Sequence, residues 1–245
     1  MTIELKAPTS WAELTLDQFR MVVEALLQHL TDNERLFLLL CQLTGIKLNG
    51  EPTADDIQQF VTSDGQTFNL RYAEIADFSN RLRWILTDDP DGVPNPSKVD
   101  DYLRDMSFGD WFETDTQFRL YDDDQDRTHF DIILPKLGMA DEPRPIGIVM
   151  ATMLKLWWHS VMGLIAPMYP NVFERSDPNS GAAEAYNPFK QLQDFHLILN
   201  EDRPQDNEKI DDARLHDVLS ALDSKIEKQK REAEAMRKIK KGGKP

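Results

Sequence analysis

Residues 15–45 read TLDQFRMVVEALLQHLTDNERLFLLLCQLTG and decide the fold class, because they contain two successive helix signals. Apolar residues recur at steps of three and four through the first half, which is the period of one face of an α-helix. Thr15 and Gln18 have the spacing of a capping box, in which two side chains and two backbone amides bond reciprocally. The first half therefore predicts an amphipathic helix over 16–30.

The second half of this stretch predicts another helix over 32–44. Thr31 and Glu34 repeat the capping pattern, and Gly45 stands where a left-handed residue commonly ends a helix. The run 36–41 is apolar throughout, so we expect this helix to be buried on all sides.

Helical signals continue to a proline-rich loop. Thr53 and Asp56 predict the start of a shorter helix that ends near Val61, followed by a turn at 63–66. A further helix is indicated by apolar residues at steps of three, four and three, namely Ile75, Phe78, Leu82 and Ile85. The first ninety residues are thus expected to be all helical. Residues 87–97 contain three prolines and cannot continue a helix, so we place a boundary there.

The central region combines aromatic, acidic and apolar segments. Residues 99–106 resume helical spacing, and the segment that follows places its large rings near one helical face, at Phe108, Trp111, Phe118 and Tyr121. Residues 122–126 are interpreted as an acidic loop. The short apolar stretch 132–134 is compatible with either a strand or a helix.

Residues 146–166 form the most apolar segment and are long enough to span a membrane. Lys155 lies near the middle, however, and a Lys at the centre of a membrane helix costs about 2.5–3.5 kcal/mol. A buried core helix is therefore favoured over a membrane span. Polar loops are expected at 176–188 and 201–208, with a short amphipathic helix between them.

The C-terminal part predicts a long helix with an uneven distribution of charge. Apolar residues follow a heptad seam over 215–236 and become fewer towards the C-terminus, so self-association through this seam is one expectation. Residues 225–245 carry nine Lys or Arg and three Glu, a net charge of +6, which leaves −21 on residues 1–224. Such asymmetry indicates a handle for an acidic partner or a tail that folds back on its own body. A solubilising tail is the simpler alternative.

Composition excludes several classes of protein. The net charge of −15 and a pI near 4.7 argue against nucleic acid or an anionic membrane as a general partner. The single Cys excludes an intramolecular disulfide and any multi-Cys zinc site. The N-terminal residues lack the basic start and apolar run of a secretory signal, so we expect a cytoplasmic protein.

Residue patterns for catalysis or metal binding are incomplete. Residues 45–50 have the glycine spacing of a phosphate-binding loop, but the Lys and the Ser or Thr that should follow are missing. Residues 122–126 resemble part of a calcium loop without its central glycine and closing Glu, so a solvated acidic loop is favoured over weak cation binding. Cys41 lies within a leucine run, which predicts a raised pKa and low reactivity. We therefore predict no catalytic residue, no cofactor and no metal ligand.

Partner binding is assigned to two groups of residues. Asp115 lies at helical spacing from Trp111 and Phe118, which places one charge on the aromatic face. It is either a helix-edge carboxylate that reaches water or a specificity contact in a partner groove. The residues predicted to bind a partner are Phe108, Trp111, Phe112, Asp115, Phe118, Tyr121, Lys228, Lys230 and Arg231.

Four segments of the chain carry a resemblance to a known family. They are 8–19 (PTSWAELTLDQF), 108–116 (FGDWFETDT), 118–121 (FRLY) and 215–223 (LHDVLSALD), the last followed by a Lys/Glu-rich helix. With these segments the chain resembles predicted tail assembly chaperones of long-tailed bacteriophages and prophages, notably those of Bacteroidetes hosts.

The resemblance implies a protein of the bacterial host cytoplasm that binds the tape measure protein and keeps it soluble while tail tube proteins are recruited. It implies no reaction and no catalytic residue, so we do not expect an enzyme. Two alternatives stay open. One is a structural virion protein, such as a tail-completion or connector subunit, and the other is a metal-dependent hydrolase that uses residues 122–126.

Taken together, the patterns predict a mainly α protein, a multi-helix globular domain with an extended basic C-terminal helix. The expected ranges are an N-terminal helical region at 1–90 and a central helical region at 91–224, which we expect to form one domain. A basic C-terminal helix or tail follows at 225–245.

Overall fold

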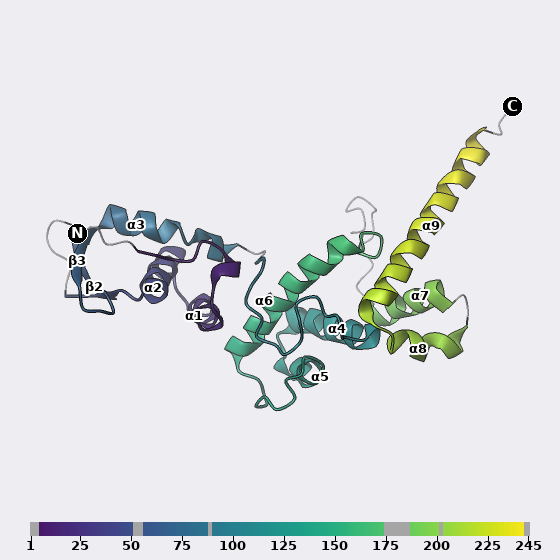
Figure 1. Ribbon diagram of the computed structural model, residues 1–245, viewed down its shortest axis with the longest axis horizontal. Coiled ribbons are helices and arrows are strands. Elements are labelled where there is room, and N and C mark those ends of the chain that lie inside the picture. The colour runs from purple at the N-terminus through teal and green to yellow at the C-terminus, as the bar shows by residue number, and fades with distance from the viewer. Residues whose placement is uncertain (1–4, 51–55, 88–89, 174–186, 201–202, 243–245) are drawn as a thin grey trace. The chain divides into compact units, whose positions relative to one another are not determined.

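A computed structural model describes residues 5–50, 56–87, 90–173, 187–200 and 203–242 (Figure 1). In these ranges a mainly α fold is present, as predicted, with one small antiparallel sheet. The strands are β1 (Lys47–Leu48), β2 (Ile57–Val61) and β3 (Thr67–Arg71). The described α-helices are α1 (Leu16–Leu26), α2 (Asp32–Thr44), α3 (Tyr72–Asn80), α4 (Phe108–Asp124), α5 (Phe130–Lys136), α6 (Ile148–Ile165), α7 (Pro188–Asn200), α8 (Asn207–Asp211) and α9 (Leu215–Gly242).

The chain divides into two compact units. The first unit comprises Met1–Pro96 and Gly147–Ser160, and the second comprises Ser97–Ile146 and Val161–Pro245. Helix α6 therefore contributes most of its length to the first unit and its last turn to the second. The predicted division at 90/91 and 224/225 stays a prediction.

Both predicted capping boxes are present in the first unit. The Gln18 amide donates to Thr15 Oγ1 at 3.2 Å, and the Glu34 amide donates to Thr31 Oγ1 at 3.4 Å. Helix α2 ends as predicted, at Gly45 with a φ of 72°. It is not buried on all sides, because Phe37, Leu38 and Cys41 are only partly covered.

Helix α1 is shorter than the predicted 16–30. The side chain of Arg35, which reaches back from α2, bonds one carbonyl group in the last turn of α1 and two in the segment that follows. The guanidinium group donates to the carbonyl oxygens of Ala25 at 3.3 Å, Gln28 at 3.4 Å and Leu30 at 3.2 Å. This side chain supplies the partners that another helical turn would have supplied, so the chain can turn after Leu26.

The expectation that the first ninety residues are all helical is wrong. Residues 57–61 form β2, which pairs with β1 on one side and with β3 on the other, in the order β1-β2-β3. Gln58 and Phe60 are buried and their neighbours are less so, which is the period of a strand. The predicted turn is confirmed between β2 and β3, where Gly65 has a φ of 85°. The predicted helix start, at residues 53–55, lies outside the described residues.

Helix α3 covers only part of the predicted apolar repeat. Ile75 is buried in α3, whereas Leu82 and Ile85 are buried beyond its end, in or beside the 3-10 helix Arg83–Leu86. The predicted loop is confirmed in the described residues of 87–97, which contain no helix or strand.

The second unit is built around α4, which contacts α5, α8 and α9. Residues 99–106 are not helical, because the Asp100 carboxylate accepts bonds from the backbone amides of Tyr102 and Arg104 and Leu103 has a φ of 51°. The expected acidic loop is also wrong in part, since Asp122 to Asp124 form the last turn of α4. The unassigned stretch 132–134 is helical within α5.

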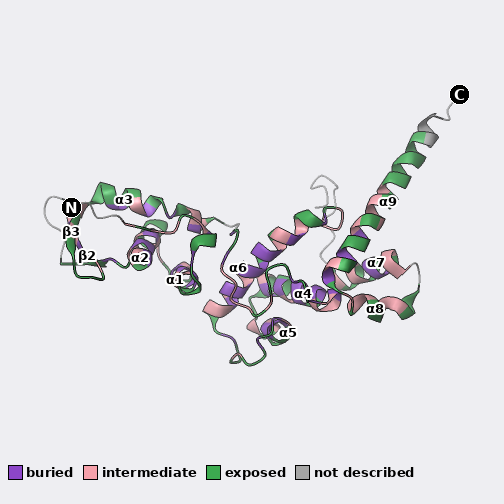
Figure 2. Ribbon diagram, viewed as in Figure 1, coloured by how far each residue is buried: buried purple, intermediate pink, exposed green. Residues whose placement is uncertain are grey.

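The remaining predicted segments agree with the structure to different degrees. Helix α6 lies within the predicted apolar segment 146–166, and helices α7 and α9 lie where the apolar spacing placed them. The expected loop at 201–208 is interrupted in its described part by a 3-10 helix (Pro204–Asp206) and the start of α8. Most of the expected loop at 176–188 lies outside the described residues. Within the second unit, buried residues line the inner faces of α4 and the first turns of α9 (Figure 2).

Candidate protein-binding surface

The aromatic face of α4 lies in the core of the second unit. The rings predicted to bind a partner have exposed fractions of 7% or less, and they are Phe108, Trp111, Phe112, Phe118 and Tyr121. Phe108 and Phe112 pack against Phe195 of α7, with ring centroids 6.1 and 6.3 Å away. Phe118 and Tyr121 pack edge-on against Phe130 of α5, with ring centroids 5.7 and 4.9 Å away. This placement corrects the expectation of an exposed aromatic surface, since the rings fasten α5 and α7 to α4.

Asp115 is held on the same helix by an ion pair. Its Oδ2 accepts a hydrogen bond of 2.7 Å from Arg119 Nε, one turn further along α4. The Asp115 side chain is 12% exposed and that of Arg119 is 49% exposed, so the pair joins a covered carboxylate to a partly solvated guanidinium. Asp115 does not line the pocket described below.

The carboxylates of the former acidic loop act as acceptors at a helix end. Asp124 accepts from His129 Nε2 at 3.0 Å and from the Asp126 amide at 2.7 Å. Asp126 accepts from the Thr128 amide at 2.9 Å. These bonds hold the pKa of both carboxyl groups below the usual value. Across the described ranges of the chain, no group of three or more His, Cys, Asp or Glu residues is arranged to hold a metal ion.

Helix α9 is fixed to the second unit near its middle. The backbone and side-chain nitrogens of Asn171 donate to the Asp223 carboxylate at 2.7 and 3.1 Å, and Lys230 Nζ donates to Asn171 Oδ1 at 3.1 Å. Lys225 Nζ donates to two carbonyl oxygens in the last turn of α7, at 2.9 and 3.1 Å. A cation at the C-terminus of a helix is favourable, so Lys225 stabilises the end of α7.

Beyond these contacts α9 extends away from the rest of the second unit (Figure 1), and every residue over 231–238 is exposed (Figure 2). Lys228 lies 4.0 Å from Glu232, and Arg231 pairs with Glu227, both at helical i,i+4 spacing. Of the basic residues predicted to bind a partner, Lys228 and Arg231 are therefore on the exposed surface, whereas Lys230 faces Asn171.

The predicted heptad seam is divided by burial. Its apolar first half is buried in the chain's own second unit, at Leu215, Val218, Leu219 and Leu222. Self-association through 215–236 would therefore have only the second half of the seam available, where Met236 is 65% exposed.

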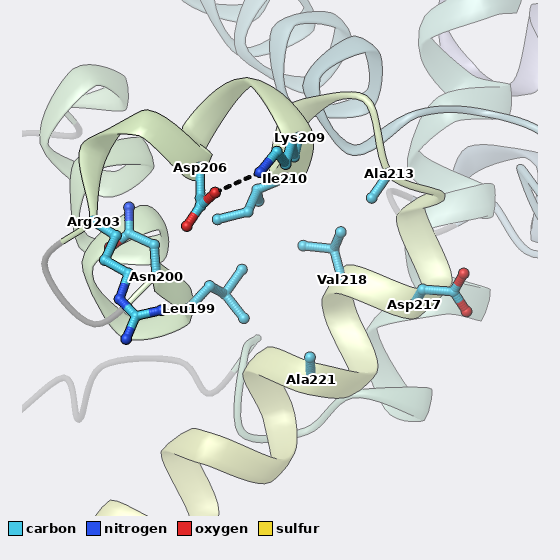
Figure 3. A pocket seen from close by; sticks show the side chains of 10 residues that line it. All are labelled: Leu199, Asn200, Arg203, Asp206, Lys209, Ile210, Ala213, Asp217, Val218 and Ala221. Atoms are coloured by element: carbon cyan, nitrogen blue, oxygen red, sulfur yellow. Dashed lines mark hydrogen bonds and ion pairs between the residues drawn. The ribbon is translucent and has the colours of Figure 1, made fainter.

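A pocket of about 490 Å³ lies where the end of α7, α8 and the start of α9 meet, and we call it the α7–α9 pocket (Figure 3). Five of its lining residues are aliphatic, namely Leu199, Ile210, Ala213, Val218 and Ala221. The other five are polar or charged, namely Asn200, Arg203, Asp206, Lys209 and Asp217. Figure 3 shows Leu199, Ile210 and Val218 pointing into the space from three separate segments.

The charged residues of this pocket include an ion pair. Lys209 Nζ lies 2.8 Å from Asp206 Oδ1 (Figure 3). The hydrogen bond between them lowers the pKa of Asp206 and raises the pKa of Lys209, because each charge favours the other. With Arg203 and Asp217 also present, the rim offers both signs of charge around an aliphatic floor. Such a surface suits binding of an amphipathic segment.

Sequence reasoning did not find the α7–α9 pocket. Its residues come from three segments, and two of the polar ones, Arg203 and Asp206, lie in a stretch that was interpreted as a loop, 201–208. One usable signal was present, because Ala213, just before α9, and Ala221, within α9, have small side chains. Small side chains permit a neighbour to approach, but they do not indicate which neighbour fills the space.

Helix α6 contains no residue of the α7–α9 pocket. Among the described residues, Ile148–Met168 is the single helical stretch long and apolar enough to cross a membrane, and 44% of its most apolar window is buried inside the protein. Trp157 and Trp158, both 1% exposed, pack edge-to-face against each other. Partial burial of this kind is also found in core helices of soluble proteins, so length and composition are weak evidence for a span.

Comparisons with protein-family models, with curated proteins and with solved structures found no match for this chain. The resemblance to tail assembly chaperones therefore stays a prediction.

Proposed function

We propose that this chain acts by binding another protein, through the α7–α9 pocket together with the exposed part of α9. One observation carries the proposal. The helix that supplies Asp217, Val218 and Ala221 to the pocket continues as an exposed basic helix. A single partner helix lying along α9 would therefore contact an aliphatic floor at one end and cations at the other.

The chemistry of this surface indicates the chemistry of the partner. Helical steps of three and four from Ala221 lead to Lys228, Glu232 and Met236 on the same side of α9. Residues 225–245 have a net charge of +6, so acidic side chains on the partner would be attracted. Aliphatic side chains of the same partner would fill the pocket. We therefore propose an acidic amphipathic helix as the bound segment.

Within this proposal the partner is the tape measure protein of a phage tail, as the resemblance implies, with tail tube proteins recruited afterwards in the host cytoplasm. The charge of −21 on residues 1–224 supports a chaperone role, since like-charge repulsion keeps complexes apart while their apolar segments are held. We assign no reaction to the chain.

The proposal predicts that a long helical protein is encoded beside this chain, and the test is co-expression with that protein, followed by purification through a tag on the partner. We expect the partner to become soluble and to carry the chain with it. Arg231→Glu should weaken the complex about tenfold, because an exposed ion pair contributes about 0.2–1 kcal/mol and the reversal replaces attraction by repulsion. Isothermal titration calorimetry measures the loss.

Arg20→Glu is the matched control. Arg20 is also exposed on a helix and also has an i,i+4 acidic neighbour, Glu24, at 3.8 Å, but it lies in the first unit. It should leave affinity unchanged. An equal loss of affinity in both variants would mean that the effect comes from the overall charge of the chain. In that case α9 would not be part of the binding surface. Failure of the partner to dissolve or to co-purify would refute the proposed function itself.

The same experiment separates a chaperone from a structural virion protein. A chaperone should be absent from purified tails when these are analysed by mass spectrometry, whereas a tail-completion or connector subunit should be present in them.

A further inference from the structure

The two halves of α9 differ in the sign of their charge. Residues 215–227 carry three acidic residues and one Lys, a net charge of −2, whereas residues 228–238 carry five Lys or Arg and two Glu, a net charge of +3. Two such helices that lie parallel place cations beside cations. Two that lie antiparallel place the acidic half of each beside the basic half of the other. The charge pattern of α9 therefore favours antiparallel pairing with a second α9.

One side of α9 is exposed along the whole of its described length. Exposed residues recur there at steps of three and four, which is the spacing of one helical face. They are Asp217, Ala221, Ser224, Lys228, Glu232 and Ala235. Three of these six side chains are Ala or Ser, and small side chains permit a second helix to approach closely.

The same exposed face begins at the α7–α9 pocket, which Asp217 and Ala221 help to line. Met236 lies near the other end of the helix and is 65% exposed. The rise of an α-helix places it about 22 Å from Ala221 along the axis. In an antiparallel pair whose two-fold axis passes midway between these two residues, Met236 of each copy lies beside Ala221 of the other. Because the arrangement is reciprocal, both pockets receive a Met236 side chain at once.

Met236 has the chemistry that this pocket accepts. Half of the lining residues are aliphatic, and the three largest of these, Leu199, Ile210 and Val218, point into the space (Figure 3). A methionine side chain is apolar and flexible, so it can adapt to an irregular cavity. Its transfer from water into the pocket supplies the hydrophobic part of the contact.

The charged residues are compatible with the same register. Asp217 and Lys238 lie at similar distances from the two-fold axis, on opposite sides of it, so Asp217 of each copy faces Lys238 of the other. Both residues are exposed. The two copies of Lys228 lie near the axis and repel each other. Each of them has Glu232 of its own chain 4.0 Å away, which reduces that repulsion.

We propose that α9 pairs antiparallel with α9 of a second copy of this chain, with Met236 of each copy in the α7–α9 pocket of the other. This pairing covers the surface that the proposed function assigns to a partner, so self-association and partner binding exclude each other. The dimer itself needs no partner. A pair of helices covers little area, so we expect a weak dimer with a dissociation constant on the order of 10 μM.

The test is sedimentation equilibrium of the full-length chain alone over a range of concentrations. Met236→Ser should raise the dissociation constant about tenfold or more, because the side chain that fills each pocket is lost. Ala221→Gln should do the same, since a longer polar side chain then occupies the pocket. Ser220→Gln is the matched control, because Ser220 is the neighbouring exposed residue and does not line the pocket. It should leave the dissociation constant unchanged.

Charge reversal tests the direction of pairing. Asp217→Lys and Lys238→Glu should each weaken the dimer of that variant, because two attractive pairs become repulsive. An equimolar mixture of the two variants should dimerise as the unchanged chain does, since each Lys then faces a carboxylate in the mixed dimer. In a parallel pair neither single change would weaken the dimer. Circular dichroism of dilute samples verifies that each variant is folded.

Several results would overturn the inference. A chain that stays monomeric at millimolar concentration would leave the pocket to a partner protein alone. A dimer that Met236→Ser and Ala221→Gln leave intact would be formed by another surface. A mixture of the reversed variants that stays monomeric would exclude the antiparallel pair. Each measurement uses the chain alone, so failure of a partner to co-purify would refute the proposed function and leave the dimer untouched.

Discussion

Cys41 shows how partial burial sets the chemistry of a single side chain. Its position in α2 raises the pKa of the thiol to about 11, because burial disfavours the thiolate. At pH 8 we expect the folded chain to react with a disulfide reagent about 100-fold more slowly than the chain unfolded in guanidinium, since two pKa units separate their thiolate fractions. The absorbance of the released thiol measures both rates. Equal rates would contradict the burial seen here.

The raised pKa of Cys41 also determines how the stability of the protein changes with pH. Between pH 9 and about pH 11 the folded state keeps the Cys41 proton that the unfolded state has lost. The free energy of unfolding should therefore fall with rising pH in this window and be unaffected by this group below pH 9. Comparison with Cys41→Ser isolates the contribution, because serine does not titrate there.

Residue-level predictions succeeded where the cause was local. The raised pKa of Cys41 followed from its apolar neighbours in the sequence. The aromatic residues of α4 were placed correctly on a helix, but they were expected to be exposed for a partner and are buried in the core. A core-facing aromatic stripe and a partner-facing one have the same spacing, and only the positions of Phe130 and Phe195 distinguish them.

At the level of elements, stability depends on caps that the sequence shows directly. The Thr31 hydroxyl accepts from the Glu34 amide, so Thr31→Ala should lower the free energy of unfolding by about 1 kcal/mol. Urea denaturation followed by circular dichroism measures the change. Ser10→Ala is the control, because Ser10 precedes a 3-10 helix and its side chain makes no capping bond. An equal effect of both changes would mean that the capping bond does not contribute.

Elements were predicted well when long and poorly when short. The capped apolar run of α2, the long apolar segment of α6 and the heptad seam of α9 each extend over several turns, so each indicates a helix. Strand β2 has only five residues, and in the sequence Thr53 and Asp56, just before it, have the spacing of a helix start. Over 99–106 the spacing was helical, but the Asp100 side chain bonds the local backbone and stops a helix from forming. Such competition between side chain and backbone is not visible in a periodic pattern.

At the level of the whole molecule, charge distribution was predictable and the pocket was not. The basic C-terminus was evident from composition, and α9 carries it as an exposed helix. The α7–α9 pocket, in contrast, is assembled from the end of α7, α8, the start of α9 and the segments that join them, all within residues 199–221. Its formation depends on how these elements pack together, which a single sequence does not specify position by position.

The exposed end of α9 permits a test of what the basic tail does for the molecule. Ending the chain after Lys230 keeps the bonds of Lys225 and Lys230 to the second unit and changes the net charge from −15 to −19. Because residues 231–238 are exposed, we expect the thermal midpoint of the free protein to be unchanged. The affinity for the partner should fall, because fewer ion pairs form with the shortened helix. For the same reason, added salt should weaken the remaining complex less than it weakens the complex of the full chain.

The control for this truncation is the full chain with Glu232 and Glu234 changed to Gln, which raises the positive charge of the same helix without shortening it. Its affinity for an acidic partner should rise and become more sensitive to salt. A truncated chain that melts at lower temperature, with its affinity intact, would instead favour a tail that folds back on its own acidic body. In that case the last turns of α9 would serve stability, and the partner would have to be bound by the α7–α9 pocket alone.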